Sequence, residues 1–168
     1  MIYILFGEMG VGKNYVGEKL AKHLNCEFFD GDTVIPATMK EKIAKFKILD
    51  QKTVRNFIYN HLIPAVQRRA IERENLVVAQ ALYRKEFRMA LIESLDVENV
   101  CPVYIKAPSF RTHMKRLLNR TNGVRWVAFC LISKFFLQKP DGDTFTISNE
   151  HENDLYSQIE KLVYETNS

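Results

Sequence analysis

The chain has 168 residues, of which 46% are hydrophobic and 26% charged, and its formal net charge is +4. This length and composition predict one soluble domain with a sizeable core. The weak positive charge suits a small anionic substrate but does not indicate a nucleic-acid partner. No apolar run is long enough to span a bilayer, and the start of the chain lacks a charged leader, so we expect neither a membrane anchor nor a signal peptide.

The cysteine and histidine positions give little sign of metal or disulfide chemistry. Cys26, Cys101 and Cys130 are an odd number with no close pair, which is typical of free thiols in a reducing compartment and favours a cytoplasmic location. The four histidines show no metal-ligand spacing, so we interpret them as ordinary surface or core residues: His23, His61, His113 and His151.

The first predicted element is a buried strand at residues 2–6, and a glycine-rich loop follows it. Residues 7–13 fit the phosphate-loop pattern G-x-x-x-x-G-K, and a helical pattern begins directly after them. In such a loop, backbone N–H groups and the end of the helix surround a phosphate, while Lys13 reaches the outer phosphates. The predicted ATP-binding residues here are Glu8, Met9, Gly10, Val11, Gly12, Lys13, Asn14 and Tyr15.

Position 14 departs from this pattern, which has a serine or threonine hydroxyl for magnesium. An asparagine oxygen is an acceptable hard ligand with a different reach, so we assign Asn14 as a metal ligand. A glycine-rich turn without a ligand, or a phosphate loop that has lost catalysis, are the alternatives.

A second strand is predicted to end at Phe28-Phe29, and two carboxylates follow it. Asp30 and Asp32 would lie at the carboxyl edge of the sheet, where ligands bind in open parallel sheets. One carboxylate can hold magnesium, assigned here to Asp30, and the other can orient an attacking hydroxyl or take its proton, assigned to Asp32. A solvated Asp-Gly-Asp turn is the alternative.

Two segments between the second and third strands are predicted to approach the substrate. Residues 33–50 are interpreted as a short helix and loop at the mouth of the site, and residues 51–74 as a helix that Pro64 kinks or divides. Arg55 lies off the apolar stripe of this helix, so it could reach a substrate anion or stay at the surface. We predict a substrate-binding segment at about residues 33–60.

The third strand is predicted at residues 76–79, because this run is too apolar for a half-exposed strand. A basic cluster that includes Arg84 begins just beyond its end and could face the site. A fourth strand is predicted at residues 103–105, and an amphipathic helix follows it.

The last third of the chain contains a predicted lid at about residues 120–128. Arg120 and Arg125 lie on a loop with turn residues at its centre, where arginines could close over a triphosphate and offset charge in the transition state. A connecting loop with solvated arginines is equally compatible.

Residues 127–137 are predicted to form a buried helix, residues 144–147 a fifth strand, and the chain to end in another helix. The alternating order predicts an α/β fold, a three-layer α/β/α arrangement with a parallel five-stranded sheet in a single domain over residues 1–168.

With these segments in order, the chain resembles the gluconokinase-like branch of small P-loop kinases, related to shikimate kinase. The resemblance rests on the phosphate loop, on F-D-G-D with Pro36, on L-D with Arg55, on V-V-A-Q-A-L-Y-R-K-E-F-R at 77–88, and on R-T-N-G at 120–123 with the following Q-K-P. It implies ATP, magnesium and transfer of the γ-phosphate to a hydroxyl of a small polyhydroxy acid such as gluconate. It also implies an adenine-stacking role for Arg120, a lid role for Arg125, and a possible homodimer.

The sequence departs from this family mostly on the substrate side. Ile35 replaces a histidine before Pro36, Gln80 replaces a serine or cysteine, and the histidine of the lid is missing. From the residues that match the family, we predict catalytic roles for Lys13, Asp32 and Arg125. We predict substrate binding by Asp32, Arg55 and Arg84. A nucleotide-binding protein with little catalysis, or a shikimate or nucleoside/nucleotide kinase of the same fold, are the alternatives.

Overall fold

The first strand lies at the centre of the fold because both of its faces are apolar. In β1 (Ile2–Phe6), every residue is buried. Ile2, Ile4 and Phe6 belong to one hydrophobic cluster, whereas Tyr3 and Leu5 belong to another. Successive side chains of a strand point to opposite faces, so β1 needs helices on both sides.

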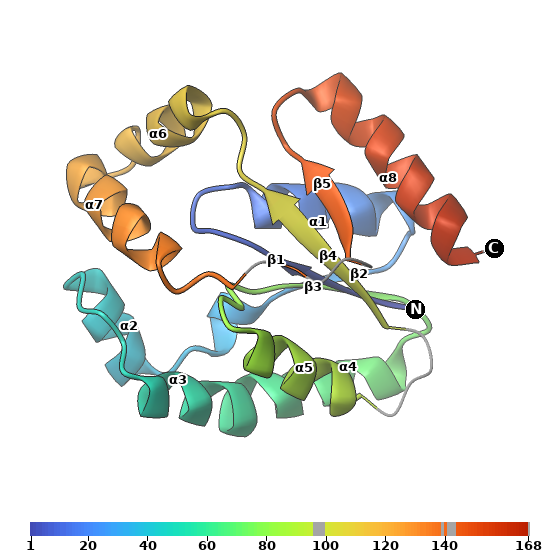
Figure 1. Cartoon of the computed structure of the whole chain (residues 1–168). Coiled ribbons are helices and arrows are strands. Elements are labelled where there is room, and N and C mark those ends of the chain that lie inside the picture. Colours follow the sequence, from blue (N-terminus) through green and yellow to red (C-terminus); the bar gives the residue numbers. More distant parts are fainter. Residues whose placement is uncertain (96–99, 139, 141–143, 168) are drawn as a thin grey trace.

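The computed structural model describes residues 1–95, 100–138, 140 and 144–167, and it confirms a five-stranded parallel sheet (Figure 1). The strand order is β2-β3-β1-β4-β5, and each pairing is parallel. The other strands are β2 (Glu27–Asp30), β3 (Leu76–Ala79), β4 (Val100–Lys106) and β5 (Phe145–Ser148).

Helices cover the two faces of the sheet separately (Figure 1). The face of Tyr3 and Leu5 packs against α1 (Lys13–His23) and α8 (Glu152–Asn167). The face of Ile4 packs against α3 (Gln51–Phe57), α4 (Ile63–Glu72) and α5 (Lys85–Glu93). The fold is therefore the predicted three-layer α/β/α arrangement.

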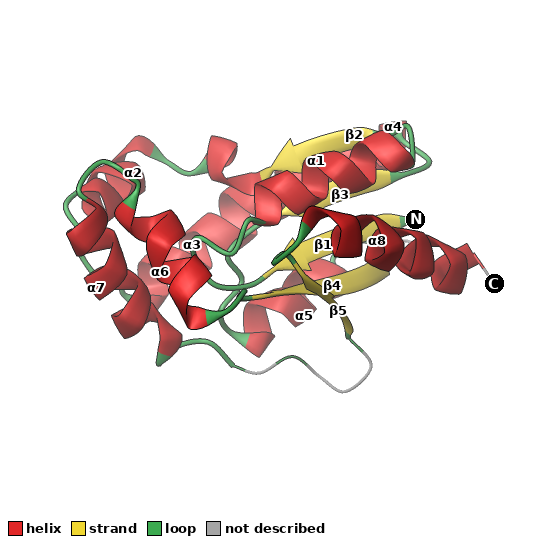
Figure 2. Ribbon diagram, turned by 90° about the horizontal axis from the view of Figure 1, so that it is seen from above, coloured by secondary structure: helices red, strands yellow, loops and turns green. Residues whose placement is uncertain are grey.

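Three further helices lie beyond the carboxyl ends of the strands (Figure 2). They are α2 (Ala37–Ala44), α6 (Phe110–Leu118) and α7 (Gly123–Lys134). Between β2 and α2, residues Gly31–Val34 form a short 3-10 turn. This arrangement encloses the edge at which the phosphate loop and the two aspartates emerge.

The sequence predicted that Pro64 kinks or divides the helical segment after residue 50, and in the structure this segment runs without a gap from Gln51 to Glu72. The residues Ile58–Leu62 form a π-helical turn between α3 and α4, and Pro64 occupies the first turn of α4. In this turn the N–H of Ile63 donates to the carbonyl oxygen of Ile58, and the missing N–H of Pro64 is tolerated because it falls in the first turn of α4.

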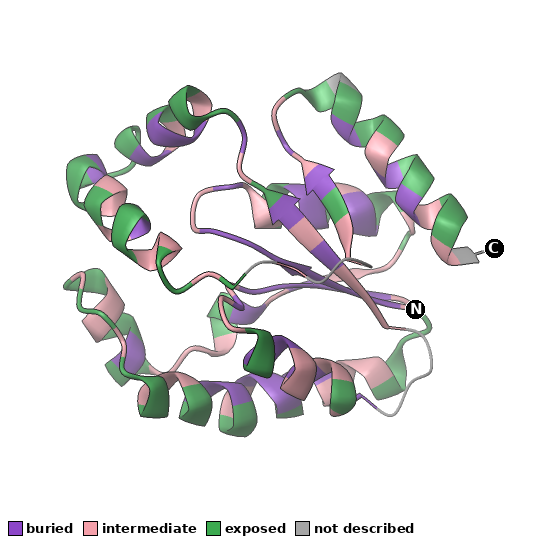
Figure 3. Cartoon of the chain, viewed as in Figure 1, coloured by how far each residue is buried: buried purple, intermediate pink, exposed green. Residues whose placement is uncertain are grey.

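The prediction of a buried helix at residues 127–137 is wrong. The helix α7 begins earlier, at Gly123, and only Gly123 and Cys130 are buried in it (Figure 3). Leu131, Ile132 and Phe136 are more than 40% exposed. An apolar run shows that a segment is hydrophobic, but not whether a second layer covers it. Within the described residues, no helix combines the length and apolarity needed to cross a membrane.

The start of the phosphate loop is tightly packed against β4, and this gives the first testable prediction. Gly7 has a φ of 152°, and a Cβ built on it would collide with the carbonyl oxygen of Ile105. We expect Gly7→Ala to lower the free energy of unfolding by about 1–3 kcal/mol, since the strain falls on backbone rather than on a mobile side chain. Chemical denaturation measures this, with Thr38→Ala on the exposed face of α2 as the control. A Gly7→Ala protein as stable as that control would show that the loop is not held against β4.

Candidate active site

The phosphate loop connects the centre of the sheet to the start of α1. It begins where β1 ends, and Gly12 precedes the first residue of α1, Lys13. Gly12 adopts a left-handed conformation with φ 93°, which favours glycine. The N-terminal end of α1, with its unpaired N–H groups, therefore faces the same space as the loop and favours an anion there.

Side chains from elements that are distant in sequence form hydrogen bonds to the backbone of the loop. The hydroxyl of Tyr83 accepts a hydrogen bond from the N–H of Met9 at 3.1 Å, and Nε2 of His113 lies 2.7 Å from the Met9 carbonyl oxygen. The Val11 carbonyl accepts from Nδ2 of Asn149 at 3.1 Å and from Arg116 at 3.4 Å. These contacts are not predictable from the sequence, where His113 has the pattern of an ordinary residue and nothing connects α6 to residue 9.

Lys13 is held against its own loop. Its ammonium donates hydrogen bonds to the carbonyl oxygens of Gly7 at 3.1 Å and Glu8 at 2.8 Å. Burial lowers the pKa of Lys13 to about 8, while the carboxylates of Asp32 and Asp30 partly oppose this shift. The lysine is thus a cation in a poorly solvated site, and a bound polyanion would stabilise its charge.

A short hydrogen-bond chain joins the loop to the carboxylates after β2. The Asn14 amide donates to Oδ2 of Asp30 at 2.7 Å, and Oδ1 of Asp30 accepts from the Asp32 N–H at 2.9 Å. Burial, and then the neighbouring charge of Asp30, raise the pKa of the Asp32 carboxyl. A raised pKa makes the Asp32 carboxylate a better acceptor for a hydroxyl proton.

Gln80 stands immediately after β3, beside these carboxylates. Its Oε1 accepts from the N–H of Ala81 at 2.6 Å, and the residue is only 4% exposed. Its Nε2 faces Asp32 closely enough to lower the pKa of that carboxyl, but it forms no hydrogen bond of good geometry within the described chain. The position of Gln80 follows from the register, since Asp30 and Leu5 both pair with Ala79.

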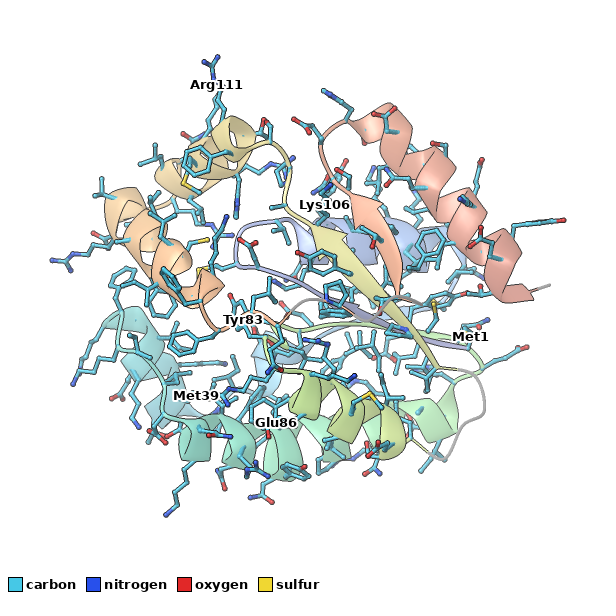
Figure 4. All side chains as sticks on the ribbon, viewed as in Figure 1. Met1, Met39, Tyr83, Glu86, Lys106 and Arg111 are labelled. Carbon is cyan, nitrogen blue, oxygen red and sulfur yellow. The ribbon has the colours of Figure 1, made fainter. Side chains whose placement is uncertain are left out.

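These groups open into one cavity of about 440 Å³. Lys13, Asn14, Asp30, Asp32 and Gln80 line it together, so the structure brings the predicted phosphate and carboxylate groups into one place. Side chains from α2, α3 and α7 form its outer walls. Figure 4 shows Met39 on the α2 side and Tyr83 nearer the centre of the fold.

The predicted arginines are distributed unevenly around this cavity. Arg84 and Arg120 line it, and Arg120 also borders a second hollow with Gly12, Tyr15 and Asn149. Arg55 does not line the cavity and forms an ion pair with Glu86 at 3.3 Å. Arg125 lies inside α7, exposed, with its guanidinium 5.9 Å from the centre of the Phe46 ring.

The remaining loop residues also have defined partners. The buried carboxylate of Glu8 lies 3.2 Å from the ammonium of Lys134 on α7. Tyr15 donates to Glu152 at 2.7 Å, which ties α1 to α8 beside the second hollow. All three cysteines are free thiols, as the sequence predicts.

This strand order, with a phosphate loop after β1 and carboxylates after β2, defines a P-loop kinase fold. A model of the shikimate kinase family matches residues 9–168. The thermoresistant gluconokinase of Escherichia coli (strain K12) is 31% identical over 145 residues, or 84% of this chain and 79% of that protein. The chain therefore belongs to the shikimate kinase family, and it is a small-molecule kinase.

Solved structures agree with this fold. A gluconokinase from Sinorhizobium meliloti has a TM-score of 0.71 at 20% identity and covers 97% of this chain and 93% of its own. A sugar kinase from a Janibacter species reaches 0.78 at 17% identity, covering 97% and 92%. A shikimate kinase from Bacteroides thetaiotaomicron reaches 0.64 at 16% identity, covering 100% and 99%.

The lowered pKa of Lys13 predicts that ATP binds more weakly as the pH rises. Above pH 8 the lysine of the free protein is mostly neutral, whereas a triphosphate favours the charged form, so binding takes up a proton. We expect the affinity to fall towards a limit of about tenfold per pH unit. Calorimetric titrations from about pH 7.5 to about pH 9.5 measure this, with Lys13→Met as the control that removes the titrating group. Equal slopes for the two proteins would contradict the assignment.

Proposed function

We propose that this protein transfers the γ-phosphate of ATP, with magnesium, to a hydroxyl of a small anionic molecule. The observation that carries the proposal is that Lys13 and Asp32 line one cavity at the carboxyl edge of the sheet. A phosphate-binding cation and a proton acceptor in one enclosed space are the two parts that phosphoryl transfer to a hydroxyl requires.

The nucleotide would lie across the phosphate loop. The backbone of residues 8–12 and the ammonium of Lys13 would hold the β- and γ-phosphates, as the motif implies. Arg120 borders both the cavity and the hollow that contains Tyr15, so it could contact the phosphates from one side and the base from the other. The adenine base would then lie in the second hollow, which Arg120 and Asn149 border.

The residues present fit a magnesium ion. The Asn14 amide nitrogen donates to Asp30, so the amide oxygen is the atom that could face a metal, and both side chains offer the oxygen ligands that magnesium prefers. When bound, magnesium would offset the charge of the phosphates. Asn14 and Asp30 would hold it, directly or through water.

Asp32 is assigned to the acceptor. Its raised pKa and its position beside Lys13 suit a carboxylate that accepts a hydrogen bond from the attacking hydroxyl and takes its proton. Arg84 lines the same cavity, 3.8 Å from Glu86, and could attract a substrate anion. The roles of Arg55 in substrate binding and Arg125 in catalysis stay predictions. Each would require its side chain to leave its present partner.

Gluconate is the first acceptor to test, because the Escherichia coli relative is named a gluconokinase. We assign the substrate-binding segment to about residues 33–60 and the lid to about residues 120–128, since Met39, Val54, Arg120 and Trp126 from these ranges line the cavity. We also propose that the enzyme is cytoplasmic and acts as a monomer or a homodimer.

A second candidate is a nucleotide-binding protein with weak catalysis, and the Asn14–Asp30 hydrogen bond is the observation that favours it. An amide that holds Asp30 in place restrains a carboxylate that would otherwise be free to reach magnesium. The two candidates differ in whether Asn14 limits turnover.

The kinase proposal predicts that Lys13→Ala loses phosphoryl transfer but keeps its fold. Removing one group that stabilises transition-state charge costs about 100- to 1,000-fold in kcat. Since burial of the charged amine opposes folding, the thermal midpoint should not fall. ADP release with magnesium, ATP and a panel of hydroxy acids measures the effect. Lys161→Ala, on an exposed part of α8, is the control. Full activity in Lys13→Ala would refute the proposal.

Asn14→Thr separates the two candidates. A threonine hydroxyl restores the magnesium ligand of the family motif and removes the amide that holds Asp30. If the present site is a competent kinase, we expect kcat to change by less than about threefold, since the amide oxygen already serves as a ligand. A gain of about 100-fold in magnesium-dependent turnover would instead support a protein whose catalysis is weakened at this position.

A further inference from the structure

Asp32 and Gln80 place a carboxylate and an amide side by side in the cavity. Gln80 has a buried amide nitrogen that faces Asp32 and forms no hydrogen bond of good geometry within the described chain. A buried donor without a partner is unfavourable, and a ligand oxygen would satisfy it. One hydroxyl placed here could accept from Gln80 and donate to Asp32.

Three other polar side chains of the cavity wall already form hydrogen bonds. The Gln51 amide donates to Glu86 at 2.9 Å, the Ser133 hydroxyl donates to the Phe129 carbonyl at 2.7 Å, and the Tyr83 hydroxyl binds Met9. Besides the groups assigned to nucleotide and magnesium, we assign the polar recognition of an acceptor to Asp32, Gln80 and Arg84, whose guanidinium lies 3.8 Å from Glu86.

Apolar side chains form the rest of the wall. They come from three helices that are distant in sequence: Met39 and Ile43 from α2, Val54 from α3, and Trp126, Phe129 and Ile132 from α7. Phe46, which follows α2, packs edge-on against Trp126 with ring centres 4.8 Å apart. This contact joins the end of α2 to α7.

We propose that the acceptor is a hydroxy acid with a largely apolar body, rather than a polyhydroxy acid. Its reactive hydroxyl would lie between Asp32 and Gln80, its carboxylate near Arg84, and its body against Met39, Val54 and Ile132. This substrate class rests on the proposed kinase function. Each further hydroxyl would lose its water against an apolar wall without a new partner, which weakens binding by about tenfold per hydroxyl.

The transfer step balances with the groups named. The hydroxyl oxygen of the acceptor forms a bond to the γ-phosphorus of ATP, and the bond from that phosphorus to the β,γ-bridging oxygen breaks. The bond's electron pair stays on ADP, and the hydroxyl proton passes to Asp32. The products are ADP and a phosphomonoester.

Binding tests the substrate class without requiring turnover. Calorimetry with magnesium and a non-hydrolysable ATP analogue would compare meta-(hydroxymethyl)benzoate, which has one hydroxyl on an apolar ring, with gluconate. We expect the benzoate to bind at least about tenfold more tightly. Equal or tighter binding of gluconate, or no binding of either acid, would overturn the proposed class.

A variant of the apolar wall provides a second test of the proposed substrate class. We expect Ile132→Asn to reduce the benzoate-to-gluconate affinity ratio by about fivefold or more, because it adds polar atoms to the wall. Ile71→Asn is the matched control, as Ile71 is 87% exposed on α4 and does not line the cavity. Equal ratios in the two variants would also overturn the class.

Turnover with ATP then distinguishes a failure of the proposed substrate class from a failure of the proposed kinase function. Phosphorylation of gluconate in preference to the benzoate would overturn the substrate class and leave the kinase function standing. Tight, selective binding of the benzoate with no phosphorylation of any hydroxy acid would overturn the kinase function while supporting the apolar ligand class.

Discussion

The structure depends on the parallel register of β1, β2 and β3, because it brings three separate chain segments to the same edge of the sheet. Ala79 of β3 pairs with Leu5 on one side and with Asp30 on the other. The phosphate loop, the carboxylates and Gln80 therefore follow strand ends that lie at the same height in the sheet. Residues from all three line one cavity. A change in register of any of these strands would separate the phosphate-binding cation from the proton acceptor.

The energetics of the site favour a ligand over the free protein. Desolvation lowers the pKa of Lys13 and raises the pKa of Asp32, and the Gln80 amide nitrogen forms no hydrogen bond of good geometry within the described chain. A bound polyanion would stabilise the charge of Lys13, and an acceptor hydroxyl would give Asp32 and Gln80 a hydrogen-bond partner. The loop keeps its shape because Tyr83, His113 and Asn149 hold its backbone from elsewhere in the fold.

Much of this could be predicted from the sequence, because the decisive signals are local. The strand at residues 76–79, the loop at residues 7–13 and the order of elements all follow from short patterns. The errors concern contacts between distant segments. The exposure of α7 depends on which helices lie opposite it, and the role of His113 depends on α6 reaching residue 9. Arg125 was expected on a loop, but α7 already begins at Gly123, so its side chain lies against Phe46.

The most direct test of the account is phosphorus NMR of the protein with ATP, magnesium and a mixture of hydroxy acids. If Lys13 and Asp32 act on one acceptor hydroxyl, a new phosphomonoester signal should grow in step with ADP. A spectrum in which only inorganic phosphate appears, or in which ATP persists unchanged while it is bound, would contradict the claim that this cavity catalyses phosphoryl transfer.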